Sequence, residues 1–157
     1  MTVDKERLAS IRARLGTLSV RLTPQRAAIL DVFLERPGSH LAAEQVYDLV
    51  RADHPDLGLA TVYRTVDVLA TNGVLRRLDL GDGRAHYELS GHDQPHYHHH
   101  LVCLACGAVR DVYDDRLAAL ERRITAQSGF TVVDHHLIFY GYCARCGVPT
   151  DRSPQYP

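Results

Sequence analysis

The chain of 157 residues contains no tryptophan, a single methionine and only four cysteines. Its apolar runs are all shorter than the roughly 18 residues that a membrane-spanning helix needs. The charged N-terminus has no apolar segment of the kind found in a secretory signal, and so few cysteines argue against a disulfide-stapled secreted scaffold. These absences predict a cytoplasmic protein with one large domain or two small ones.

Histidine is abundant instead, and it is concentrated in the second half of the chain. Eight of the ten histidines lie at or after His86, and so do all four cysteines. Imidazole and thiolate groups are common protein ligands of transition metals. The composition therefore predicts metal binding in the second half.

Charge is unevenly distributed, although the formal net charge is only −1. Residues 1–30 carry six cations against two acids, whereas residues 85–157 carry six arginines against eight acids. Because nucleic acid binds to a local basic patch, the near-neutral total leaves DNA binding open. Taken alone, the basic segment is explained more simply as a solvated helix face.

The first half has the pattern of several helices followed by a β-hairpin. Helical spacing predicts helices over residues 4–15, from Thr23-Pro24 to Pro37-Gly38, from Leu41 to Val50 and from Leu59 to Asn72-Gly73. Alternation predicts strands over residues 74–80 and 84–89, joined by the turn Gly81-Asp82-Gly83. This order is typical of a winged helix-turn-helix, whose last helix enters the major groove of DNA.

The predicted last helix carries side chains suited to DNA. Its exposed face is expected to show Thr61, Tyr63, Arg64 and Thr65. Arginine can bind guanine through two hydrogen bonds, and threonine or tyrosine can contact bases or phosphates. The alternative from spacing alone is a three-helix core with an incidental arginine.

After a polar break at residues 90–95, the pattern changes to a small α/β domain. Strands are expected over residues 98–103, 107–112 and 130–142, and a helix over residues 114–128. A domain this small needs additional stabilisation. A bound metal and a partner subunit would both supply it.

The four cysteines form two C-x-x-C-G motifs, Cys103/Cys106 and Cys143/Cys146. Two such pairs make a tetrahedral four-sulfur set, the closed geometry of structural zinc. The alternatives are two redox dithiols or buried free thiols, and we favour zinc because paired motifs of this kind are typical of it.

The histidines before the first cysteine pair predict a second kind of site. On a strand, His98 and His100 point to one side and His99 to the other. Nearby carboxylates are Glu88, Asp93 and Asp111, and His40 is a more distant candidate ligand. A mixed histidine–carboxylate site is more reversible than four thiolates and suits Fe(II) or Mn(II).

Several motifs together resemble the ferric uptake regulator family. They are TPQRAAIL, SHLAAEQVY, GLATVYRTVDVLATNG, a wing ending in YEL, HHHLVCLACG and YGYCARCG, and they extend from about Val20 to Gly147. The resemblance implies a homodimeric, metal-responsive transcriptional repressor that binds an AT-rich inverted repeat. The α+β chain would comprise a winged-helix DNA-binding domain (1–89), a hinge (90–95), an α/β metal-binding dimerisation domain (96–150) and a flexible tail (151–157).

The resemblance also assigns roles to individual residues. It places structural zinc on Cys103, Cys106, Cys143 and Cys146, and the regulatory metal on His40, Glu88, His98 and His100, joined in some members by Asp111. Tyr63 and Arg64 fall on the recognition-helix contacts, and Arg21 on the basic residue that enters the minor groove.

Two departures from the family pattern matter. A further metal site in many members would use His99 and His135 with ligands at Tyr97 and Ala118, which cannot supply them, so we expect that site to be absent or degenerate. A loop insertion after Glu88 brings His92, Asp93 and His96 close enough to substitute for regulatory ligands.

The residues also bear on the branch of the family to which the chain is similar. Zinc uptake regulators often carry a cysteine or an aspartate where this chain has Leu75-Arg76-Arg77, which argues against zinc sensing. Peroxide sensors resemble the set but have aspartate in place of Glu88, while Asp111 matches them. We favour Fe(II) or Mn(II) sensing. Peroxide sensing is the first alternative, and zinc uptake regulation is the second alternative.

Enzymatic and storage functions fit the sequence less well. A metal-dependent hydrolase needs an open coordination position and a base aimed at bound water, and no H-E-x-x-H motif is present. A metal buffer would explain the histidines and cysteines but not the predicted DNA-binding helix and wing. We therefore expect no enzymatic activity.

Overall fold

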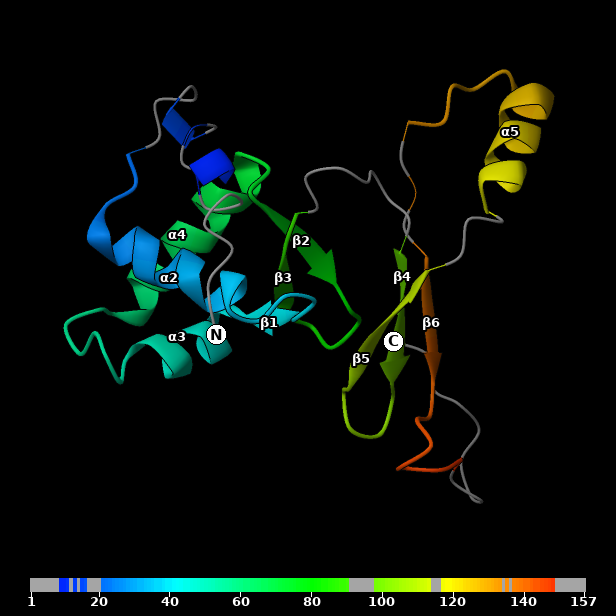
Figure 1. Cartoon of the computed structure of the whole chain (residues 1–157). Coiled ribbons are helices and arrows are strands. Elements are labelled where there is room, and N and C mark those ends of the chain that lie inside the picture. Colours follow the sequence, from blue (N-terminus) through cyan, green and yellow to red (C-terminus); the bar gives the residue numbers. More distant parts are fainter. Residues whose placement is uncertain are drawn as a thin grey trace. The chain divides into compact units, whose positions relative to one another are not determined.

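The structure is a computed structural model that describes residues 9–11, 13, 15–16, 21–90, 98–113, 117–133, 135 and 137–148. The chain divides into two compact units, Met1–Ser90 and Gly91–Pro157, and each contains a three-stranded sheet (Figure 1). No helix in the described part is long and apolar enough to cross a membrane. Most of the predicted hinge, the predicted tail and the substitute ligands His92, Asp93 and His96 lie outside the described residues.

The first unit contains the helices α2 (Pro24–Leu34), α3 (Ala43–Val50) and α4 (Leu59–Thr71). Local signals explain their ends. The Thr23 hydroxyl accepts a hydrogen bond from the Arg26 amide at 3.4 Å, and proline follows as the first helical residue. At the end of α4, Gly73 has φ 66°, and the amides of Gly73 and Val74 donate back to helix carbonyls. Both predicted signals are confirmed.

The helices enclose the core of this unit through their apolar faces. Val62, Val66 and Leu69 recur at helical spacing on α4 and are fully buried. Thr65 was expected on the exposed face but is only 2% exposed. The prediction for Thr65 is wrong because this position, three residues after Val62, lies on the buried side of the helix. Tyr63 and Arg64 lie on the outer side.

The wing is the sheet formed by β1 (Leu41–Ala42), β2 (Leu75–Asp79) and β3 (Ala85–Leu89), in the order β1-β3-β2 with antiparallel pairing. Leu41 and Ala42 were expected to begin a helix. They instead pair with Tyr87 and His86 of β3, so the helix starts at Ala43. A strand of two residues depends on its distant partner, which helical spacing does not report.

The second unit contains β4 (His98–Cys103), β5 (Val109–Tyr113), α5 (Leu117–Ser128) and β6 (Ile138–Gly141). Its sheet has the order β5-β4-β6, with β4 antiparallel to β5 and parallel to β6. The strand expected over residues 130–142 is too long, because among the described residues of this range only Ile138–Gly141 form a strand beside β4. Phe130 and Val133 lie outside the strand and are 75% and 86% exposed.

Helix α5 has an apolar stripe without a buried residue in this single chain. Leu120 and Ile124 lie on that stripe and remain about two-fifths exposed, at 41% and 43%. An amphipathic helix normally buries such a stripe against another element.

Candidate metal centres and nucleic-acid interface

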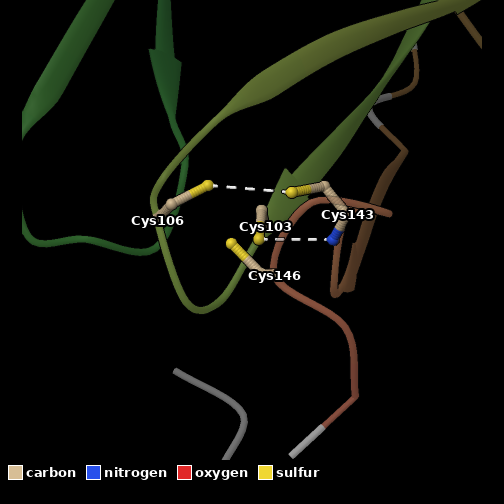
Figure 2. A group of neighbouring side chains, drawn as sticks. All are labelled: Cys103, Cys106, Cys143 and Cys146. Atoms are coloured by element: carbon tan, nitrogen blue, oxygen red, sulfur yellow. Dashed lines mark hydrogen bonds between the residues drawn. The ribbon is translucent and has the colours of Figure 1, made fainter.

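The four cysteine side chains lie together at one end of the second sheet, and Figure 2 shows their sulfur atoms turned toward a common space. Parallel pairing of β4 with β6 sets Cys103 beside Gly141, so the two C-x-x-C segments that follow these strands come side by side. The four Sγ atoms lie within 4.8 Å of one another. All four cysteines are free thiols.

The two segments have the same backbone geometry. Gly107 and Gly147 have φ 68° and 66°, in the region that disfavours any residue with a Cβ atom. Their amides donate to the carbonyls of Cys103 and Cys143 at 2.8 and 3.0 Å. The glycine in each C-x-x-C-G motif therefore closes a tight turn around a pair of thiols.

The sulfur separations and the local electrostatics fit a tetrahedral dication. Zinc–sulfur bonds of about 2.3 Å separate tetrahedral ligands by about 3.8 Å, and Cys106 Sγ lies 3.9 Å from Cys143 Sγ. The backbone amides of Cys143 and Cys106 lower the pKa of Cys103 to about 6. The sulfurs of Cys106 and Cys143 raise the pKa of Cys146 to about 12. A bound dication would relieve this crowding by stabilising all four thiolates.

In the first unit, His40 and Glu88 form a nearly buried pair. His40 Nε2 lies 3.2 Å from one carboxylate oxygen of Glu88, and Arg76 Nη1 lies 3.4 Å from the other. The wing sheet sets both contacts, since Arg76 pairs with Glu88 across β2 and β3 and His40 directly precedes β1. A buried carboxylate needs such partners to offset its lost hydration.

In the second unit, His98, His100 and Asp111 lie together. The rings of His98 and His100 meet edge to face, with centroids 5.1 Å apart. Asp111 pairs with His100 across β4 and β5, and its Oδ1 lies 3.3 Å from His100 Nδ1. The predicted regulatory ligands thus form two local sets, each with imidazole and carboxylate donors.

On the other side of β4, His99 lies near His135, with ring centroids 5.5 Å apart. His135 Nδ1 lies 2.5 Å from Glu121 Oε1 on α5. Ala118, one turn earlier on α5, offers no ligand. Tyr97 lies outside the described residues, so the expectation that this family site is degenerate stays a prediction.

The exposed side of α4 carries the predicted DNA contacts. Tyr63 is 40% exposed, and Arg64 is exposed and donates to the hydroxyl of Thr61 at 3.3 Å. Tyr63 also donates a hydrogen bond to Glu44 of α3. Arg21, just before α2, is exposed, and its carbonyl accepts a hydrogen bond from Arg26 at 2.8 Å.

Three residues that contact candidate site residues were not predicted from the sequence. They are Arg76, which contacts Glu88, Glu44, which contacts Tyr63, and Glu121, which contacts His135. The contact of Arg76 had a usable signal, since a hairpin centred on Asp82 sets residues 76 and 88 opposite each other. Glu121 lies one helical turn beyond Ala118 and was also findable by periodicity. Glu44 had no such signal, because its partner is 19 positions away on another helix.

Comparisons with known proteins agree with one another. The model of the Ferric uptake regulator family matches residues 17–140. The Ferric uptake regulation protein of Bacillus subtilis (strain 168) is 43% identical over 142 residues, covering 90% of this chain and 95% of that protein.

Two solved structures show the same fold at lower identity. The ferric uptake regulator from Francisella tularensis with iron has a TM-score of 0.72 at 28% identity, covering 80% of this chain and 93% of that one. The ferric uptake regulator from Pseudomonas aeruginosa with manganese has a TM-score of 0.70 at 28% identity, covering 85% and 97%.

Proposed function

Since the chain belongs to the ferric uptake regulator family of metal-sensing transcriptional repressors, we propose that its regulatory metal is Fe(II) or Mn(II). Proteins of this family are transcription regulators and not enzymes. Two mixed donor sets carry the proposal. One consists of His40 and Glu88, and the other of His98, His100 and Asp111. Neutral imidazole and carboxylate oxygen are ligands that Fe(II) and Mn(II) accept.

We propose that one regulatory metal takes ligands from both sets. Each set alone would leave several coordination positions of a divalent ion without a protein ligand, whereas together they offer five donor residues. A metal held by both units would couple its own binding to the orientation of the DNA-binding unit. Binding of metal and binding of DNA would then strengthen each other reciprocally, which is allostery in the thermodynamic sense.

A second metal, zinc, is proposed for the four cysteines. The sulfur separations support this assignment, and all four donors come from one unit. When bound, zinc supplies folding energy to a domain too small for a large core. Its role is therefore structural and separate from sensing.

The proposed partners are DNA and a second copy of the chain. Thr61, Tyr63 and Arg64 would read an AT-rich inverted repeat in the major groove, with Arg21 reaching the minor groove. A homodimer matches an inverted repeat by symmetry. Exposed apolar side chains of the second unit, including Leu101, Leu120, Ile124 and Phe139, support dimerisation through that unit. A repressor of this kind would act in the cytoplasm.

The test is the affinity of the full-length, zinc-loaded protein for duplex DNA, with Fe(II), Mn(II) or added Zn(II). The duplex is an AT-rich inverted repeat recovered from random DNA by the metal-loaded protein. We expect Fe(II) or Mn(II) to raise the affinity at least tenfold and chelation to reverse it without unfolding. Equal affinity with and without these metals would overturn the proposal.

Peroxide sensing is the second candidate, because the carboxylate of Asp111 lies against His100. Exposure of the Fe(II)-loaded protein to hydrogen peroxide separates the two. A regulator of metal supply regains DNA binding when Fe(II) is restored, whereas a peroxide sensor stays inactive and its Mn(II)-loaded form resists peroxide.

A further inference from the structure

A hydrogen bond ties the exposed face of α4 to the preceding helix. The Tyr63 hydroxyl donates to the Glu44 carboxylate from 19 positions further along the chain. Glu44 lies in the first turn of α3 and is half-buried, while Tyr63 is 40% exposed. The bond crosses between the two helices at the surface that the proposed function assigns to DNA.

Both partners hold the protonation state that the bond requires. The hydrogen bond from Tyr63 and a backbone hydrogen bond lower the pKa of Glu44, and the charge of Arg84 in the wing lowers it further. The same bond to Glu44 raises the pKa of Tyr63. At neutral pH the carboxylate is therefore ionised and the phenol protonated, which gives a charge-assisted hydrogen bond.

The tether determines which part of Tyr63 is available to a ligand. A tyrosine side chain has few torsions, and a fixed hydroxyl restrains them together with the ring. The single phenolic proton is used by Glu44, so it is not free for a phosphate oxygen. Tyr63 is 40% exposed, and its ring offers an apolar surface that can pack on the C5-methyl group of thymine.

We propose that Glu44 is a positioning residue for sequence recognition, holding Tyr63 so that its ring, and not its hydroxyl, contacts the DNA. The proposal rests on the proposed DNA-binding role of α4 and deepens it. The group on the DNA that we expect Tyr63 to contact is a thymine methyl group in the operator. An ordinary surface hydrogen bond without a role in recognition is the competing interpretation, and it predicts no effect on DNA affinity.

A double-mutant cycle tests the proposal in the full-length, metal-loaded dimer. Glu44→Ala, Tyr63→Phe and their combination are compared on the selected operator and on a scrambled duplex of the same composition. We expect each single variant to lose about tenfold in operator affinity, the scale of a charge-assisted hydrogen bond. The double variant should lose no more than either single, and scrambled DNA should bind all four proteins alike.

Thymine-to-uracil substitution in the operator tests the contact with the methyl group directly. If Glu44 had a purely structural role, removing the methyl groups would change the DNA affinity of wild type and Glu44→Ala equally. Loss of the methyl groups should weaken binding by the wild type and weaken binding by Glu44→Ala less. Glu44→Gln retains a hydrogen-bond acceptor and should recover most of the affinity. Asp48→Ala removes an acid from the same helix, where Asp48 pairs with Arg51, and should match the wild type.

The outcomes distinguish the positioning role of Glu44 from the proposed DNA-binding role of α4. Unchanged or tighter operator binding by Glu44→Ala, losses that multiply in the double variant, or equal uracil effects in both proteins would overturn the positioning role. Normal operator binding by Arg64→Ala and Tyr63→Ala would instead refute DNA reading by α4. Circular dichroism of every variant confirms folding, and Glu44→Leu, which has a similar volume but no hydrogen-bond acceptor, replaces Glu44→Ala in the cycle should the latter unfold.

Discussion

The cysteine cluster and the histidine–carboxylate sets differ in how the chain assembles them. All four thiols lie in the second unit, on turns fixed by one pair of strands. The regulatory candidates are divided, with His40 and Glu88 in the first unit and His98, His100 and Asp111 in the second. A site built within one unit suits a permanently bound structural ion. A set of ligands divided between two units suits a regulatory ion, because its binding can change how the units are oriented.

The largest expected effect is on the cysteine side of this comparison. Cys103→Ser should release zinc and unfold the second unit, because binding of structural zinc contributes on the order of 10 kcal/mol to folding. Zinc content, circular dichroism and sedimentation measure the three consequences. Retention of one zinc per chain in a folded dimer would show that the four thiols do not form a single site.

The matching change on the regulatory side should have a narrower effect. His98→Ala should leave a folded dimer with its zinc but weaken regulatory metal binding about 100-fold or more, since even indirect partners of a metal account for 10–100-fold. DNA affinity should then no longer respond to Fe(II) or Mn(II). An unfolded or zinc-free His98→Ala protein would contradict the division between the two kinds of site.

A smaller effect is expected from the cation beside the regulatory carboxylate. Arg76 contacts Glu88 and repels an incoming divalent ion, so Arg76→Gln should tighten Mn(II) binding several-fold, within the ~1 kcal/mol typical of partly exposed charges. Arg77→Gln is the matched control on the same strand. Weaker Mn(II) binding by Arg76→Gln alone would show instead that Arg76 holds Glu88 in place.

The smallest effect is expected at the group formed by His99, His135 and Glu121. His135→Ala should leave the number of bound metal ions per chain unchanged, because Ala118 supplies no ligand there. Metal content after equilibrium dialysis measures this number. Loss of one ion per chain would show that Glu121, which contacts His135, completes a site that the family pattern does not predict.

Local signals made much of this fold predictable. The capped start at Thr23-Pro24 and the glycine stop at Gly73 depend on neighbouring residues only, and both are confirmed. The lengths of β1 and β6 depend on where a distant strand ends, so a single sequence could not give them. The contact between Glu44 and Tyr63 depends on how α3 packs against α4 and left no pattern in the sequence.

The central proposal is that a single regulatory metal takes ligands from both donor sets. Mn(II) binding, followed by electron paramagnetic resonance of zinc-loaded protein, tests it in wild type, His40→Ala, His98→Ala and the double variant. The account predicts that each single variant loses the same Mn(II) ion and that the double variant loses no more. Mn(II) binding that survives in His40→Ala at wild-type affinity would contradict it, because the site would then belong to the second unit alone.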